Sequence, residues 1–213
     1  MVVAVGPLSR GKSRLGPSFD GAARRGLVLA MLQDVLAAVR SAHRGAVFVV
    51  TPDPEVDPVG QSHGAEVLRD AGDGTNAAIE AALADERVAT SGAVLVVQGD
   101  LPHLTGAQVG ECLEALAAAE VIAVLVPNDD GGTSALGLRP PNVMATAFGP
   151  QSGQGHRDAA ARAAVELREL RIAGLAADVD TVEDLERVRA MVGPATAAVL
   201  AAISVGTEEG AAP

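Results

Sequence analysis

Short, unbroken apolar runs alternate along the chain with longer stretches in which apolar residues recur at helical spacing. Ala93–Val97 is an example of the runs, and Gly21–Ala42 of the helical stretches. An unbroken apolar run predicts a strand buried on both faces, and its alternation with helices predicts an α/β fold around a largely parallel sheet. We predict strands at Val2–Val5, Ala46–Thr51, Glu66–Leu68, Ala93–Val97, Val121–Val126, Ser134–Leu138 and Glu169–Ala173. We predict helices at Gly21–Ala42, Thr75–Ala89, Thr105–Ala119, His156–Leu167 and Thr181–Val192.

Capping signals and loop composition add boundaries to this pattern. Thr105 can cap the helix that follows it, and Thr181-Val-Glu-Asp184 has the spacing of a capping box. Residues 52–60 are rich in Pro and Asp and predict a loop. The small and polar residues 206–213 predict a disordered tail, which leaves residues 1–205 as one globular domain.

The first polar segment, Gly6-Pro-Leu-Ser-Arg-Gly11-Lys12-Ser13, matches the P-loop pattern G-x-x-x-x-G-K-[ST]. A P-loop needs a helix that begins at its lysine, so that the helix N-terminal amides and the lysine converge on the phosphates. Pro17 would end such a helix after about one turn, and the first long helical pattern starts only at Gly21.

The favoured interpretation is an extended Gly/Ser loop that wraps a triphosphate in another way. Gly6 and Gly11 allow close approach of the backbone to phosphate oxygens, and Lys12 and Arg14 supply positive charge. A solvated basic turn and a true P-loop remain as alternatives.

Composition excludes some classes of partner. A net charge of −11 with three Phe, no Tyr and no Trp provides neither a basic footprint nor a stacking surface, so we expect no nucleic-acid partner. No run approaches the ~18 apolar residues of a membrane span, so a cytoplasmic protein without membrane contact is expected. Cys112 lies in an Ala/Leu-rich helical pattern that predicts a buried, inert thiol.

Polar residues follow several predicted strands, where ligands of open α/β sheets bind. Gly72-Asp-Gly-Thr-Asn76 permits close backbone approach to a base or ribose, although Gly-Asn is also a common helix cap. Asp100 follows a buried strand, and Asp178 and Asp180 alternate as in a strand. Three such carboxylates supply the hard oxygen ligands of a Mg²⁺ bound with phosphates, whereas Asp180 alone could be a helix N-terminal residue.

A second polar region extends from residue 129 to residue 160. Its hydroxyls, free amides and basic side chains suit a small phosphorylated acid, and an ordinary surface loop is the alternative. The residues concerned are Thr133, Ser134, Gly149, Ser152, Arg139, His156 and Arg157.

The order of these motifs resembles a known family. The segments are LSRGKSRL, GDGTNAAIEAA, GDLPHLT, GGTSALGLRPP, FGPQSGQGH and DVDTVEDLERV. Together they resemble the 2-phospho-L-lactate or phosphoenolpyruvate guanylyltransferases that make the deazaflavin coenzyme F-420, over about residues 2–192. The resemblance implies a single-domain Rossmann-like nucleotidyltransferase fold, with a mostly parallel central sheet and helices on both faces. Molybdopterin guanylyltransferases share this fold.

The resemblance also implies a role for individual residues. Gly11, Lys12 and Arg14 would bind the phosphates of GTP, with Gly74 and Asn76 near its nucleoside. The implied Mg²⁺ ligands are Asp100, Asp178 and Asp180, and the implied residues for the three-carbon acid are Thr133, Gly149 and Ser152. Lys12, Arg14 and Asp100 would be the catalytic residues of an attack by the acid's phosphate on the α-phosphorus of GTP, which expels pyrophosphate without a protein nucleophile.

Four residues depart from the family's usual pattern, namely Gly6, Thr75, Ser134 and Gly153. The Arg-rich composition favours phosphoenolpyruvate as acceptor, with 2-phospho-L-lactate next. Alternatives are a nucleotidyltransferase for a sugar phosphate or a molybdopterin, and an inactive GTP-binding regulatory protein. A downstream transferase of the same pathway is a candidate partner, as is a second copy of the chain bound through Pro194–Ile203.

Overall fold

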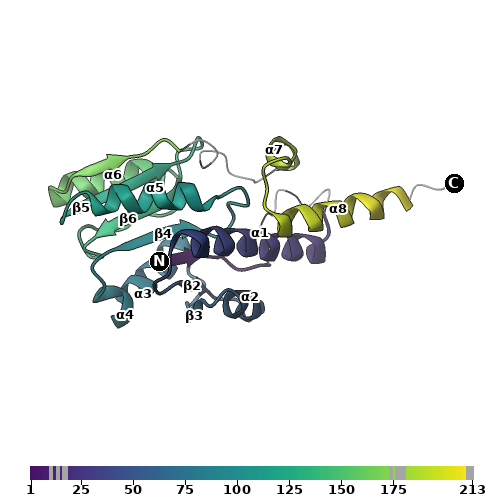
Figure 1. Ribbon diagram of the computed structural model, residues 1–213, viewed down its shortest axis with the longest axis horizontal. Coiled ribbons are helices and arrows are strands. Elements are labelled where there is room, and N and C mark those ends of the chain that lie inside the picture. Colours follow the sequence, from purple (N-terminus) through teal and green to yellow (C-terminus); the bar gives the residue numbers. More distant parts are fainter. Residues whose placement is uncertain (10–11, 13–14, 16–18, 173–174, 176–180, 210–213) are drawn as a thin grey trace.

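The computed structural model describes residues 1–9, 12, 15, 19–172, 175 and 181–209, with side chains up to residue 203. These residues form one seven-stranded sheet with the order β3-β2-β1-β4-β6-β5-β7 (Figure 1). Its strands are β1 (Val2–Ala4), β2 (Phe48–Thr51), β3 (Glu66–Arg69), β4 (Val94–Gln98), β5 (Ile122–Pro127), β6 (Thr133–Arg139) and β7 (Leu167–Glu169). Only β6 is antiparallel to its neighbours, so the prediction of a mostly parallel sheet is confirmed.

Helices cover both faces of the sheet. They are α1 (Gly21–Ala42), η2 (Pro54–Val56), α2 (Asp57–Ser62), α3 (Thr75–Ala84), α4 (Glu86–Ala89), α5 (Gly106–Ala117), α6 (Ser152–Ala163), α7 (Val182–Val188) and α8 (Pro194–Glu209). Residues of α1, η2 and α5 pack with Val3, Val49 and Leu95 on one face. Residues of α3, α4 and α6 pack with Val2, Val50 and Val96 on the other. Adjacent strand residues thus enter opposite cores, as the unbroken apolar runs predict. Among the described residues, no helix is long and apolar enough to cross a membrane.

Several predicted boundaries are wrong in detail. The helix predicted at His156–Leu167 begins at Ser152 and ends at Ala163, and the following strand lies at Leu167–Glu169 instead of Glu169–Ala173. The predicted Pro/Asp loop contains η2 and α2, because Asp53 and Pro54 start a short helix. The cap at Thr105 and the capping box of Thr181 with Asp184 are confirmed, and Thr105 also forms a capping box, with Gln108.

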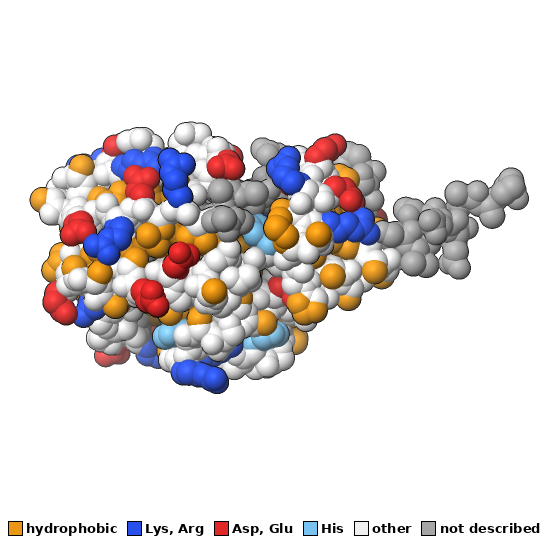
Figure 2. Space-filling view, turned by 45° about the horizontal axis from the view of Figure 1, so that its top comes forward, with side chains coloured by type: hydrophobic (Ala, Val, Ile, Leu, Met, Phe, Trp, Pro, Cys, Tyr) orange, Lys and Arg blue, Asp and Glu red, His pale blue; other side chains and the backbone are white. Residues whose placement is uncertain are grey.

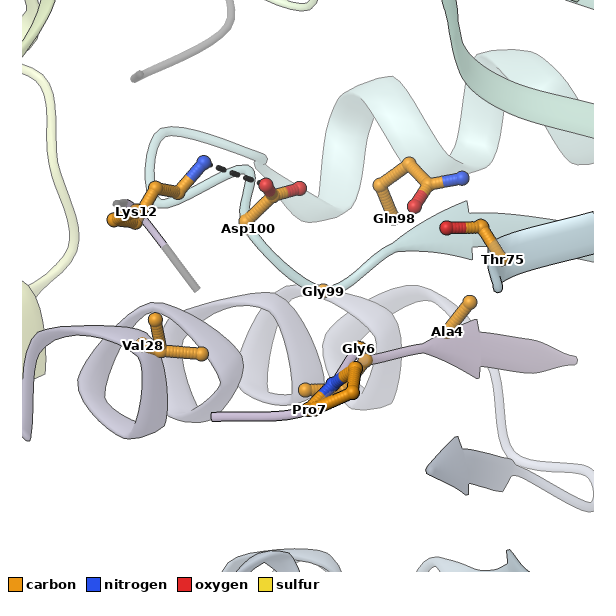
Figure 3. A pocket seen from close by; sticks show the side chains of 10 residues that line it. Ala4, Gly6, Pro7, Lys12, Val28, Thr75, Gln98, Gly99 and Asp100 are labelled. Carbon is orange, nitrogen blue, oxygen red and sulfur yellow. Dashed lines mark hydrogen bonds and ion pairs between the residues drawn. The ribbon is translucent and has the colours of Figure 1, made fainter. Parts of the chain in front are cut away.

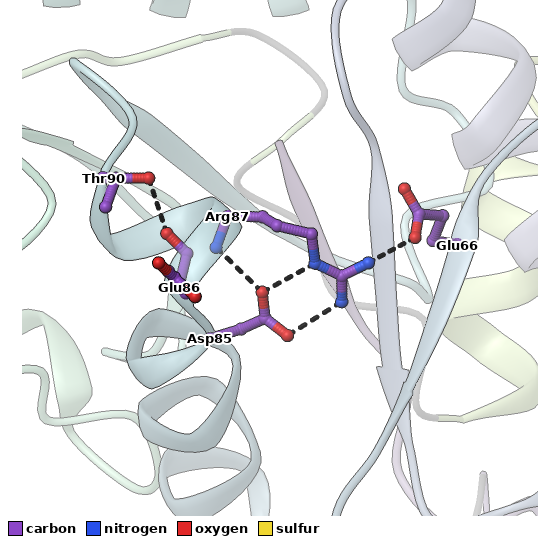
Figure 4. Close-up of polar contacts among 5 residues, drawn as sticks. All are labelled: Glu66, Asp85, Glu86, Arg87 and Thr90. Carbon is purple, nitrogen blue, oxygen red and sulfur yellow. Dashed lines mark hydrogen bonds and ion pairs between the residues drawn. The ribbon is translucent and has the colours of Figure 1, made fainter.

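The helix predicted at Thr75–Ala89 is divided at Asp85. This residue has extended backbone angles, and its side chain accepts the backbone N–H of Arg87 at the start of α4. Arg87 forms two further hydrogen bonds of 2.8 Å to the Asp85 carboxylate and pairs with Glu66 of β3 (Figure 4). Its guanidinium also stacks over the Phe48 ring of β2. The paired guanidinium lowers the pKa of Asp85 to about 2. Tertiary contacts with β2 and β3 therefore fix a break that the apolar periodicity does not show.

The C-terminal helix α8 lies along α1 (Figure 1). The buried carboxylate of Asp34 in α1 accepts the backbone N–H groups of Ala195 and Thr196 at 3.0 and 2.9 Å, which caps α8 from another helix. A Cβ at Gly193 would lie 2.3 Å from the Asp34 carboxyl carbon, so the approach requires glycine. The Gly193 N–H also donates to the Pro102 carbonyl at 2.7 Å. α8 extends over residues 206–209, and the tail prediction for residues 210–213 lies outside the described residues.

We predict that Asp34→Ala lowers the free energy of unfolding by about 3 kcal/mol, because two buried N–H groups lose a charged acceptor. Chemical denaturation measures this change. The matched comparison is Asp20→Ala, which removes a single exposed cap on Ala23 of α1 and should cost about 1 kcal/mol. Equal losses in the two variants would contradict the structural role of Asp34.

Candidate active site

Three adjoining pockets form one cleft along the edge of the sheet where β1 and β4 end. The central pocket, of about 230 Å³, contains Lys12 and Asp100. The glycine pocket, of about 180 Å³, contains Asp70, Gly72 and Gly74. The hydroxyl pocket, of about 170 Å³, contains Thr133 and Ser152. Thr75 lines all three pockets, so they are continuous.

An ion pair occupies the middle of the cleft. Lys12 Nζ lies 2.6 Å from Asp100 Oδ2, the Lys12 side chain is buried, and the Asp100 carboxylate is 42% exposed (Figure 3). Burial alone would raise the pKa of Asp100, but the charge and hydrogen bond of Lys12 hold it below its ordinary value. Asp100 is therefore an ionised, accessible carboxylate that already holds one cation.

The P-loop alternative does not fit this geometry. The first long helix, α1, begins at Gly21 with Asp20 as its cap, so no long helix starts at Lys12. Lys12 instead has a left-handed backbone with φ 51°, and its side chain reaches across to the end of β4. Lys12 therefore presents its cation from the segment between β1 and α1, ahead of the first turn of α1.

The glycine pocket combines backbone freedom with a carboxylate. Gly72 and Gly74 have φ of 78° and 108°, which a side chain would disfavour, and both line the pocket. Asp70 Oδ1 accepts the Gly72 N–H at 2.6 Å, whereas Asp70 Oδ2 is shielded from solvent and receives no hydrogen bond. A buried carboxylate oxygen without a donor is costly, so Asp70 is an unsatisfied acceptor at the edge of this pocket.

The hydroxyl pocket has a neutral, hydrogen-bonded wall. Ser152 Oγ donates to Thr133 Oγ1 at 2.9 Å, and His156 Nδ1 lies 3.0 Å from the same oxygen. His156 is fully buried, and desolvation lowers its pKa to about 4, so the ring is neutral at pH 7. Gly149, with φ 135°, adds a backbone turn to the wall.

Asn76 contacts the loop before α6 and does not itself line the three pockets. Its Oδ1 accepts the Phe148 N–H at 2.8 Å, and its Nδ2 donates to Glu80 at 2.9 Å. The side chain thereby ties α3, next to the glycine pocket, to the loop that carries Gly149.

Two basic residues of the second polar region lie outside the hydroxyl pocket. Arg139 pairs with Glu120 at 2.8 Å, and Arg157 forms a two-point pair with Glu169 at 2.7 and 2.8 Å. The expectation that they surround the acid is therefore not supported by their positions. On the face shown in Figure 2, basic and acidic side chains are interspersed.

Other predicted residues lie outside the described part of the chain: Gly11, Arg14, Asp178 and Asp180. Ser134, which departs from the family pattern, is buried and donates to the Leu175 carbonyl at 2.6 Å. It therefore holds the segment that leads toward Asp178 instead of lining the hydroxyl pocket. Gly6 and Thr75, two further departures, do line the cleft.

Two contributors to the cleft were missed from the sequence: Asp70 and Gln98. Each ends or directly follows a strand, so the rule that ligands bind beyond the carboxyl ends of strands could have found them. His156 was named with the second polar region, but its buried place behind Thr133 was not predicted, because the two residues are 23 positions apart in the chain.

Comparisons with known proteins identify the family of the chain. The family described as "Guanylyl transferase CofC like" matches residues 1–199. The chain belongs to this family. It is 41% identical over 193 residues to a phosphoenolpyruvate guanylyltransferase of Rubrobacter xylanophilus, covering 90% of this chain and 94% of that relative. It is also 41% identical over 223 residues to a phosphoenolpyruvate guanylyltransferase of Rhodococcus opacus, covering 95% and 90%.

The guanylyl transferase fold is also found among solved structures. A candidate nucleotide-diphospho-sugar transferase of Desulfovibrio desulfuricans superposes with a TM-score of 0.75 at 18% identity, covering 96% of this chain and 94% of that one. At this identity the likeness shows the fold, and it confirms the nucleotidyltransferase architecture that the motifs imply.

We predict that acid destabilises this guanylyl transferase partly through His156. Its pKa is about 4 in the folded state and 6.5 as its ordinary value, so between these limits only the unfolded chain binds the proton. The free energy of unfolding should therefore fall as the pH falls from 6.5 to 4, by up to about 3 kcal/mol from this group. Denaturation of the wild type and of His156→Phe at both pH values measures the difference, and equal pH slopes would contradict it.

Proposed function

We propose that the protein transfers GMP from GTP to the phosphate of phosphoenolpyruvate and releases pyrophosphate. The observation that carries this proposal is the order of the three pockets. A glycine pocket with a carboxylate adjoins a central ion pair, which adjoins a pocket walled by hydroxyls. A nucleoside triphosphate and an acidic acceptor would meet at the centre.

Guanine fits the glycine pocket by its chemistry. Its N1–H and 2-amino group form a donor pair, and Asp70 Oδ2 is an acceptor without a donor that would meet them after the side chain turns toward the pocket. Adenine presents an acceptor at N1, which a carboxylate repels. Asp70 would therefore select GTP over ATP, while the unrestricted backbone at Gly72 and Gly74 lets the nucleoside approach.

The triphosphate would then lie over the central pocket. Lys12 is placed to neutralise phosphate oxygens, and Asp100 is placed to hold a cation beside them. The Asp100 carboxylate is ionised and 42% exposed, so it offers the kind of hard oxygen ligand that Mg²⁺ prefers. Asp100, Asp178 and Asp180 would hold the ion, which when bound neutralises charge on the phosphates.

The chemistry needs alignment more than a protein nucleophile. A phosphate oxygen of the acceptor attacks the α-phosphorus of GTP, the bond from that phosphorus to the β-phosphate oxygen breaks, and pyrophosphate leaves with the electron pair. The attacking oxygen is already anionic, so no base has to remove a proton. Lys12 and Arg14 would stabilise the charge that moves toward the leaving group.

Two observations favour phosphoenolpyruvate as the acceptor. The hydroxyl pocket offers Thr133, Ser152 and the Gly149 backbone to a small anion. Relatives at 41% identity over nearly the whole chain are named phosphoenolpyruvate guanylyltransferases. 2-Phospho-L-lactate is the next candidate because it has the same carboxylate and phosphate.

The first test is pyrophosphate release from GTP and Mg²⁺ with phosphoenolpyruvate, 2-phospho-L-lactate, 3-phosphoglycerate or no acceptor. We expect release with phosphoenolpyruvate. Asp100→Asn should lose about a hundredfold or more of this activity, far more than any loss of stability accounts for, since the variant should still be folded at the assay temperature. If only another acid supports pyrophosphate release, that acid is the acceptor in place of phosphoenolpyruvate. If GTP binds but no acid supports pyrophosphate release, the inactive regulatory protein is favoured. Release of orthophosphate from GTP without an acceptor would favour a hydrolase.

Asp70→Asn should weaken guanine selection, because the amide can turn a donor toward the donor edge of the base. We expect kcat/KM for GTP to fall about tenfold or more, with a smaller loss for ITP, which lacks the 2-amino group. The matched control is Asp73→Asn, an exposed carboxylate of the same loop that does not line the pockets. If the ratio of kcat/KM for GTP to kcat/KM for ITP is the same in Asp70→Asn as in the wild type, the assignment of Asp70 to the base is wrong.

A further inference from the structure

His156 occupies a fully buried position behind the hydroxyl pocket, and the reaction does not use it directly. Both ring nitrogens have hydrogen-bond partners: Nε2 contacts Ala147 in the loop before α6, and Nδ1 contacts Thr133 of β6. The ring also packs edge-to-face against Phe148, with centroids 4.8 Å apart. These contacts fix the ring orientation.

The backbone determines which nitrogen carries the proton. The Ala147 N–H donates to His156 Nε2 at 3.0 Å, so Nε2 must present a lone pair. A neutral imidazole has one N–H, which therefore lies on Nδ1. The Nδ1–H then donates to Thr133 Oγ1, at 3.0 Å.

The fixed tautomer leaves one hydroxyl proton for the pocket. Thr133 and Ser152 have two O–H protons between them, and their mutual hydrogen bond uses one. Neither proton can go to His156, because Nδ1 is itself a donor. The remaining O–H must point elsewhere, and both side chains line the hydroxyl pocket.

We infer that His156 is a positioning residue, which acts through Thr133 to make the hydroxyl pocket a hydrogen-bond donor toward an anionic group of the acceptor. The opposite tautomer would turn a hydroxyl proton back toward the ring and leave lone pairs facing the anion. The loop that supplies the Ala147 N–H is held in turn by the bond from Phe148 N–H to Asn76. The role of His156 in acceptor binding rests on the proposed function, whereas the tautomer follows from the hydrogen bonds alone.

The tautomer can be measured without any reaction. ¹⁵N NMR of histidine-labelled protein at pH 7, with assignment from the signals that disappear in His156→Phe, reports which nitrogen carries the proton. We expect His156 as the Nδ1–H form, which is the less common one in water. An Nε2–H form would overturn the inference and would leave the proposed function untouched. If His156→Phe does not fold, assignment through the Phe148 and Ala147 backbone signals serves instead.

The functional consequence is tested by a double-mutant cycle. His156→Phe keeps the ring packing and removes both nitrogens, Thr133→Val removes the hydroxyl, and Thr133→Ser is the control that retains it. We expect the KM for phosphoenolpyruvate to rise about tenfold in His156→Phe and in Thr133→Val, with kcat changed less than threefold and the KM for GTP unchanged. The double variant should be no worse than Thr133→Val alone, because His156 acts through that hydroxyl.

Additive losses in the double variant, or an unchanged acceptor KM in His156→Phe, would overturn the positioning role. A wild-type protein that shows the Nδ1–H form but no turnover with phosphoenolpyruvate would instead reject the proposed acceptor. Failure of the inference and failure of the proposed function are therefore distinguishable.

Discussion

The antiparallel course of β6 is the constraint on which the cleft depends. β6 lies between β4 and β5, with Ala135 opposite both Val97 and Val126. This pairing brings the first residue of β6, Thr133, to the same edge where β4 delivers Asp100. If β6 ran parallel to β4, its last residue, Arg139, would lie at this edge of the sheet. Thr133 would then lie at the opposite edge, away from Asp100.

The central pocket is charged, whereas the wall of the hydroxyl pocket is neutral, and burial accounts for the difference. Lys12 and Asp100 stay ionised because each compensates the other, and the half-exposed carboxylate remains open to a cation. The described hydrogen-bond partners of His156 carry no charge, so desolvation keeps the ring neutral and the wall acts through hydrogen bonds. In the proposed reaction, a highly charged triphosphate and a smaller acid would thereby meet surfaces of different character.

The loops at the cleft are held from behind by buried hydrogen bonds. The Pro102 carbonyl, two residues beyond Asp100, accepts the Gly193 N–H at the start of α8, which Asp34 caps. Ser134 similarly holds the Leu175 carbonyl in the segment that leads to Asp178. The position of Asp100 therefore depends on the docking of a helix almost one hundred residues further along the chain.

The sequence by itself determined the first six strands, the long helix α1, the cap at Thr105, the capping box at Thr181 and the family, because these depend on local periodicity, short-range capping or the order of motifs. The rule for strand ends also singled out Asp100, but its ion pair with Lys12 was not predicted. The break at Asp85, the start of α6 and the tautomer of His156 were decided only by the tertiary structure. Each depends on partners distant in the chain, such as Glu66 for Arg87 and Thr133 for His156, and local propensity cannot report the direction of a buried hydrogen bond.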